Sequence, residues 1–215
     1  MSTWSNYSPQ PQPPRRPQRR RSPLLVRLTP PLLVVALMWI VFALELVAGP
    51  EIVRAGSIPS GDFSRPWTWF TAVFIHLSTS HIAGNTPFML VLGILIGLEG
   101  VGRWAGVSLF GVIGGGIGAT VLSTNTLTAG ASGVIYCYLG YLLAAAFTEK
   151  NLSQKVWRIV VAAAILFFYS GTIIYGFIPH AAVSWQCHLG GFIGGILAAI
   201  VFEGREARRA RSYPA

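Results

Sequence analysis

The sequence predicts an all-α membrane protein built as a bundle of six helices. Of its 215 residues, 53% are hydrophobic and only 11% are charged, whereas charged residues make up roughly 25% of an ordinary soluble domain. The apolar residues fall in long uncharged runs rather than at the spacing of amphipathic helices or strands. Only helices and closed barrels satisfy their backbone hydrogen bonds in lipid, and runs of this length favour helices.

Residues 1–28 are expected to form a disordered basic tail. The stretch up to Pro23 is rich in Pro, Gln, Ser and Arg and holds few apolar groups that could offset the cost of ordering. The apolar run from Leu32 to Ala48 is too long for a signal peptide and shows no convincing small-residue cleavage site, so we expect it to remain as the first span. Residues 29–204 then form the membrane domain, and residues 205–215 form a second basic cytoplasmic tail.

Five further apolar runs complete the six spans. They are expected at His81 to Leu98, Trp104 to Val121, Ser132 to Phe147, Val156 to Ile174 and Trp185 to Phe202. With both termini in the cytoplasm, 14 of the 16 Lys and Arg residues lie on the cytoplasmic side and only Arg54 and Arg65 lie outside, which agrees with the positive-inside rule. Topology in the plasma membrane therefore explains the net charge of +9, and we expect the lipid bilayer rather than nucleic acid as a partner.

The longest connection, Gly49 to Ser80, is expected on the outer side, between the first two spans. Its aromatic residues include Trp67 and Trp69. Tryptophan rings prefer the headgroup layer, so this loop is expected to lie along the membrane surface rather than to extend into solvent.

Polar side chains gather at the outer ends of the even-numbered spans. The second span opens with His76, His81 and Asn85, the fourth with Ser132 and the sixth with His188. Polar residues in membrane helices are rare and usually face the bundle interior, so their collection at one depth predicts a functional site. The fourth span has 16 residues, which is short for a hydrocarbon core of about 30 Å. We therefore expect its serine to lie below the outer surface, in a cavity that water enters from outside.

Ser132, between Gly130 and Gly133, is interpreted as a nucleophile, and His188 as the base that takes its proton. These groups must approach to about 3 Å, which requires close helix backbones. A run of glycines that includes Gly191 follows the histidine and allows that approach.

Backbone N–H groups at the start of the fourth span are expected to stabilise an oxyanion. Asn85 can add its amide, with His81 one helical turn before it on the same face; an interhelical hydrogen bond is the alternative role for Asn85. The sequence places no acidic residue beside His188, so we predict a Ser-His dyad. Tyr136, one turn after the serine, is the candidate that packs against the imidazole.

Other notable residues are interpreted as structural. Glu45 in the first span is either a helix contact or a gate, and the contact is favoured. Cys137 and Cys187 are interpreted as small apolar residues rather than a disulfide or a metal pair. Nothing functional is expected of His180 in the last outer loop, and no metal or cofactor is expected.

Three motifs follow one another along the spans. They are His76-x4-His81-x3-Asn85, then Gly130-Ala131-Ser132-Gly133 with Tyr136 after it, then His188-Leu189-Gly190-Gly191. Together with the outer loop around Arg65 to Trp69 and the Gly97-Leu98-Glu99 turn, they resemble the rhomboid family of intramembrane serine proteases, in that family's order. The resemblance covers nearly everything from Leu32 to Phe202. Pro87 departs from the family pattern and predicts a kink close to the site.

The resemblance implies a rhomboid-like bundle in which Ser132 attacks the scissile carbonyl and His188 acts first as general base and then as general acid. His81, Asn85 and the Ser132 N–H would form the oxyanion hole, and His76 would be a structural residue near the site. Substrates would be single-span membrane proteins, admitted sideways past the second and fifth spans. They would be cut in or near a transmembrane segment that has small, helix-weakening residues.

Two other classes of function remain open. A non-catalytic relative would bind membrane-protein clients, but such relatives usually lack the serine or the histidine, and both are present. A small transporter with a histidine relay would pair an intramembrane acid with its histidines and show an inverted repeat, and the sequence shows neither.

Overall fold

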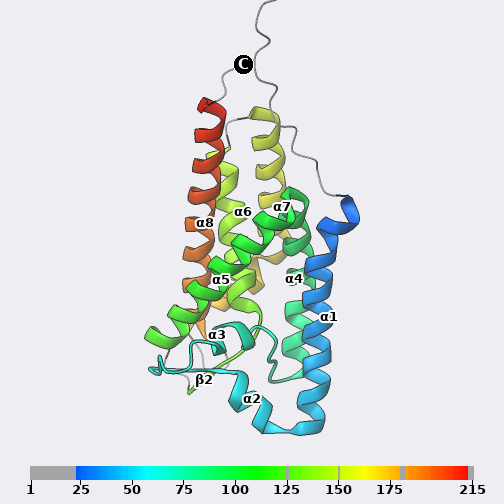
Figure 1. The fold of residues 1–215 in the computed structure, drawn as a ribbon, viewed down its shortest axis with the longest axis vertical. Helices are drawn as coiled ribbons and strands as arrows, with labels where there is room; N and C mark the ends of the chain where they lie inside the picture. Colours follow the sequence, from blue (N-terminus) through cyan, green and yellow to red (C-terminus); the bar gives the residue numbers. More distant parts are fainter. Residues whose placement is uncertain (1–22, 124–125, 150, 180–182, 213–215) are drawn as a thin grey trace, which may run out of the picture.

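The computed structural model describes residues 23–123, 126–149, 151–179 and 183–212. Six long helices run through the bundle (Figure 1): α1 (Leu24–Ala48), α4 (Thr79–Glu99), α5 (Val101–Leu122), α6 (Ser132–Thr148), α7 (Leu152–Phe177) and α8 (Trp185–Ser212). Each coincides with one of the expected spans. The predicted fold class, an all-α six-helix bundle, is therefore confirmed.

Helix length and composition agree with a multi-pass membrane protein. Among the described helices, α1, α4, α5 and the Trp185–Arg205 part of α8 are long and apolar enough to cross a membrane. α6 is a shorter apolar helix of 17 residues, close to its expected length. α7 has 26 residues, which at about 1.5 Å each exceeds the thickness of the hydrocarbon core.

Both end helices extend into the expected tails. α1 begins at Leu24, inside the expected tail of residues 1–28, because Leu24, Leu25 and Val26 continue its apolar run. α8 continues to Ser212, although the second tail was expected from residue 205. The charged end of α8 is rich in Glu, Ala and Arg, which are good helix formers. These charges end the apolar part of α8, but the helix continues beyond it.

The outer loop folds back onto the bundle. It contains α2 (Pro50–Gly56), β1 (Ile58–Pro59) and α3 (Thr68–Thr71). β1 pairs antiparallel with β2 (Leu127–Thr128), just before α6. The Gly130 N–H donates to the Ala72 carbonyl at 2.8 Å, and Trp69 Nε1 donates to Thr120 Oγ1 of α5 at 3.1 Å. The loop therefore fixes the segment that leads into α6.

Glycines bring α8 against both α5 and α6. A Cβ at Gly191 or Gly195 would overlap backbone carbonyl groups of α6. On the other side of α8, Gly190 and Gly114 of α5 approach so closely that a Cβ on either would overlap the carbonyl of the other. These contacts agree with the close helix approach expected from the glycines that follow His188. As a result, the first turns of α6 and α8 lie against each other.

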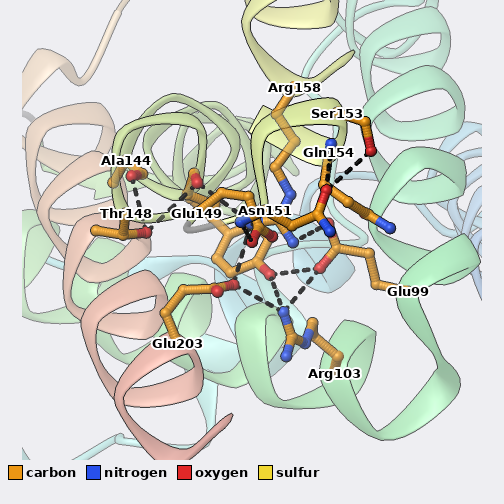
Figure 2. A network of polar contacts seen from close by, with 12 residues as sticks. Glu99, Arg103, Ala144, Thr148, Glu149, Asn151, Ser153, Gln154, Arg158 and Glu203 are labelled. Carbon is orange, nitrogen blue, oxygen red and sulfur yellow. Dashed lines mark hydrogen bonds and ion pairs between the residues drawn. The ribbon is translucent and has the colours of Figure 1, made fainter. Parts of the chain in front are cut away.

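At the other end of the bundle, five charged residues form an inner charge cluster, defined as Glu99, Arg103, Glu149, Arg158 and Glu203 (Figure 2). Arg103 lies 3.0 Å from Glu99 and 2.9 Å from Glu203. Arg158 of α7 lies 3.1 Å from Glu203 and 3.4 Å from Glu99. The cluster joins α4, α5, α7, α8 and the end of α6, a connection that the sequence did not predict.

Candidate active site

Ser132 is the first residue of α6 and follows a sharp turn at Gly130. Gly130 has φ of +115°, a conformation that side chains disfavour. A Cβ at this position would also lie only 2.6 Å from His81 Nε2. The turn therefore requires glycine, and it brings the backbone just before the serine close to the second-span histidine.

His188, in the first turn of α8, faces the serine. Its Nε2 lies 2.8 Å from Ser132 Oγ, within hydrogen-bonding distance. The histidine is buried, with 8% of its surface exposed. Two residues separated by 56 positions are thus in direct contact, because the glycines of α6 and α8 allow the backbones to touch.

Two neighbours hold the imidazole of His188. The ring of Tyr136 stacks on it, with centroids 4.2 Å apart and planes 10° apart. On its other nitrogen, Nδ1 lies 2.6 Å from the Gly176 carbonyl oxygen at the end of α7. Because a carbonyl oxygen only accepts, Nδ1 carries the proton, and the lone pair of Nε2 accepts from the Ser132 hydroxyl.

Hydrogen-bond donors converge beside the serine. Asn85 Nδ2 is buried and has no hydrogen-bond partner among the residues that the structure describes. His81 and Asn85 both line the cavity that contains Ser132. As the first helical residue, Ser132 presents a backbone N–H that has no acceptor within α6. These groups can therefore donate to a developing oxyanion.

His76 lies outside the cavity and does not belong to α4, contrary to the expectation that it opens the second span. α4 begins at Thr79, because the Ser78 side chain accepts from the His81 N–H and caps the helix. The His76 ring packs edge-on against the His81 ring, with centroids 5.0 Å apart. Burial, and to a smaller degree the nearby His81, lower the pKa of His76 to about 4.

Glu45 of α1 contacts this same segment. Its carboxylate accepts from the His76 backbone N–H at 3.2 Å. The side chain is buried. Glu45 was expected to be either a helix contact or a gate. The structure shows a contact, between α1 and the loop before α4.

A cavity of about 440 Å³ contains the serine and the histidine. Residues of α4, α6, α7 and α8 line it, together with Thr128 and Ala129 before α6. The apolar side chains that line it include Phe88, Leu92 and Ile165. None of the described residues that line it is acidic.

The remaining expected residues lie around this cavity. Gly133 and Gly191 form the backbone contact between α6 and α8 and do not line it. Cys137 and Cys187 are buried free thiols, as expected of apolar filler. α4 is helical from Thr79 to Glu99, with Pro87 inside it. His180 lies outside the described residues.

Sequence reasoning missed Gly176, which supplies the acceptor for His188. A backbone carbonyl has no signature of its own in a sequence. The available signal was a glycine two residues beyond the expected fifth span. The structure extends α7 to Phe177, so this glycine lies in the last helical turn, where carbonyl groups have no N–H partner within the helix.

Comparison with known proteins agrees with the motifs. The family model described as "Rhomboid domain" matches residues 64–205. An uncharacterised protein of Mycobacterium tuberculosis is 31% identical over 188 residues, covering 83% of this chain and 75% of that protein. Rhomboid protease GluP of Bacillus subtilis is 30% identical over 134 residues, 62% of this chain and 25% of the relative. Rhomboid protease GlpG of Pectobacterium atrosepticum is 28% identical over 162 residues, 74% of this chain and 57% of the relative. The chain belongs to the rhomboid family.

Proposed function

We propose that this protein is an intramembrane serine endopeptidase that uses a dyad of Ser132 and His188. The observation that carries the proposal is the 2.8 Å contact between Ser132 Oγ and His188 Nε2 inside a cavity among four helices. A serine is activated when a base within hydrogen-bonding reach accepts its proton, and this pair meets that requirement.

In the first step, Ser132 Oγ attacks the scissile carbonyl carbon while His188 Nε2 takes the hydroxyl proton. The carbonyl oxygen becomes an oxyanion that accepts from the Ser132 N–H, the Asn85 amide and His81. Each such donor contributes about 10²- to 10³-fold to the rate in serine proteases. The imidazolium then protonates the leaving amine, and the C–N bond breaks to leave an acyl-enzyme.

In the second step, His188 takes a proton from a water molecule, which attacks the acyl carbon. Collapse of the second oxyanion returns the proton to Ser132 Oγ and releases the new carboxylic acid, which ionises in water. The reaction needs no group beyond these side chains, backbone donors and water.

The substrates we propose are single-span membrane proteins, cut in or near their transmembrane segments. The cavity has residues of both α4 and α7 in its wall, so a chain that passes between these helices reaches the serine. The distribution of Lys and Arg supports a plasma-membrane orientation with both termini inside and the cavity opening to the outer face. The names of two relatives, rhomboid proteases GluP and GlpG, support the reaction class.

The test uses the full chain in liposomes with a labelled transmembrane substrate. Ser132→Ala and His188→Ala are each expected to lower the cleavage rate by about 10⁴-fold or more. Ser153→Ala, an exposed serine at the start of α7, is the matched control and should cleave like wild type. A fluorophosphonate probe should label wild type and Ser153→Ala but not Ser132→Ala.

Cleavage by Ser132→Ala at the wild-type rate would refute the dyad. If wild type binds the substrate but neither cuts it nor reacts with the probe, the protein is instead a binder of membrane clients.

A further inference from the structure

The C-terminal end of α7 supplies hydrogen-bond acceptors to the end of the bundle that contains Ser132 and His188. The Gly176 carbonyl oxygen lies 2.6 Å from His188 Nδ1. Tyr136, which stacks on the same imidazole, donates its hydroxyl to the Ile173 carbonyl at 2.9 Å. α7 therefore contacts both the histidine and the ring that packs against it.

We propose that the Gly176 carbonyl is the positioning group of His188 and takes the place of the carboxylate in a Ser-His-Asp triad. This inference rests on the proposed function and deepens it. The carboxylate of a triad holds the imidazole in the correct tautomer and stabilises the imidazolium that forms. The Gly176 carbonyl can do both, because it accepts from Nδ1 and leaves the Nε2 lone pair facing Ser132.

The position of Gly176 in the helix strengthens this role. The last four carbonyl groups of a helix lack N–H partners within it, and Gly176 is in the last turn of α7. The C-terminal end of a helix also carries partial negative charge, which favours a cation such as imidazolium. None of the described residues lining the cavity is acidic, so no carboxylate from the cavity wall competes for this place.

Glycine is required at position 176 because the helix approaches so closely. A Cβ there would overlap the Tyr136 hydroxyl and would lie 3.0 Å from His188 Nδ1. In contrast, a Cβ at Gly171, in the same helix, meets none of the described atoms within 4 Å. An alanine at 176 would thus force the end of α7 apart from Tyr136 and from the histidine that this ring stacks on, whereas one at 171 would not.

The position of the last turn of α7 and the orientation of the His188 ring are therefore linked through this hydrogen bond. Whenever this turn moves away from α8, the imidazole loses its Nδ1 acceptor, and the serine loses an aligned base. Acylation therefore requires the end of α7 to be in place against the histidine.

The first measurement compares Gly176→Ala with Gly171→Ala in the full chain, reconstituted in liposomes with the labelled substrate. Gly176→Ala is expected to lower kcat by about 10²-fold with little change in KM, as expected for a misplaced catalytic group. Gly171→Ala should stay within about twofold of wild type. Thermal unfolding in detergent reports whether each variant is folded.

The second measurement reads the tautomer directly. The chain has only four histidines, so selective 15N labelling gives a simple spectrum, and His188→Ala assigns the His188 signals. Wild type is expected to show Nδ1 protonated and Nε2 unprotonated. A folded Gly176→Ala protein should show a mixture of the two tautomers, whereas a purely structural defect would leave the tautomer unchanged.

Either of two results overturns the inference: an Nε2-protonated His188 in wild type, or a folded Gly176→Ala protein that cleaves as fast as Gly171→Ala. If Gly176→Ala does not fold, the wild-type spectrum still tests the inference, because it shows which nitrogen of His188 carries the proton. Failure of the proposed function is distinguishable, since it appears as a wild-type protein that neither cleaves nor reacts with fluorophosphonate, whatever its tautomer.

Discussion

Glu45 places a buried carboxylate against the backbone that leads into α4. Both of its oxygens accept from the His76 N–H, at 3.2 and 3.3 Å. Glu45→Ala removes the acceptor and leaves a buried N–H unpaired, so we expect the free energy of unfolding to fall by about 1–3 kcal/mol. Glu45→Gln keeps an amide oxygen in place and should lose less. Thermal unfolding in detergent measures both variants, and equal losses would contradict the role of this acceptor.

His76 should make the stability of the protein depend on pH. Its pKa is about 4 in the folded protein, against 6.5 for an ordinary histidine, because burial disfavours the charged form. Between these pH values the unfolded chain binds more protons than the folded one. The contribution of the neutral His76 to the free energy of unfolding is therefore fully present above pH 6.5 and is lost as the pH drops toward 4. A shift of this size corresponds to about 3 kcal/mol.

The measurement for His76 is the unfolding temperature in detergent between pH 7 and pH 4, compared with His76→Asn. Asparagine can keep the donor that His76 Nδ1 directs to the Phe74 carbonyl, but it does not titrate. Glu45 and His81, which face this residue, are the same in both proteins, so the difference between the two curves isolates His76. Parallel curves would show that His76 does not titrate as we expect.

At the scale of elements, the contact between α6 and α8 depends on glycine. A Cβ at Gly195 would overlap the Cys137 carbonyl and would lie 2.6 Å from the Tyr141 nitrogen, both backbone groups that cannot rotate away. Gly195→Ala is therefore expected to lower the free energy of unfolding by about 1–3 kcal/mol. It should also slow cleavage, because α8 carries His188.

Gly204→Ala is the matched control for Gly195→Ala, since it lies on the same helix and, in the part of the chain that the structure describes, its Cβ would meet nothing within 4 Å. Alanine has a higher helix propensity than glycine by up to about 1 kcal/mol, so this variant should be neutral or slightly stabilised. Chemical unfolding in detergent and the cleavage assay would be run on both. A Gly195→Ala protein as stable as Gly204→Ala would contradict the close α6–α8 contact.

At the scale of the whole molecule, the inner charge cluster connects α4, α5, α7 and α8 with the end of α6. Arg158 approaches three carboxylates, those of Glu99, Glu149 and Glu203. Its side chain is only 12% exposed. Arg158→Met leaves these acids with Arg103 as their one remaining cation in the cluster, so we expect the free energy of unfolding to fall by about 3 kcal/mol.

The surface pair of Arg54 and Glu51 provides the comparison for the cluster. Their side chains are 63% and 76% exposed, and breaking such a pair with Glu51→Gln should change stability by less than about 1 kcal/mol. Unfolding at low and high salt separates the two cases, because salt screens the exposed pair more strongly. Similar losses in both variants would show that the inner charge cluster is no stronger than a surface ion pair.

Much of this protein could be predicted from its sequence. The six helices were visible because each is a long apolar run, and lipid allows such a run few conformations other than a helix. The approach of Ser132 and His188 followed from the glycines beside them, since small residues are what bring membrane helices together. The catalytic role of the two residues stays a prediction. The helix ends were less visible, because charged residues such as those after Arg205 end a span but not a helix.

Tertiary structure alone decided how distant groups meet. The Gly176 carbonyl is a backbone group, so no side-chain pattern in the sequence predicts its contact with His188. The ion pair of Arg103 and Glu203 joins residues 100 positions apart. Hydropathy determines which segments enter the membrane, but the rotation and tilt of each helix, which choose the partners of its polar groups, depend on side-chain packing among all six helices at once.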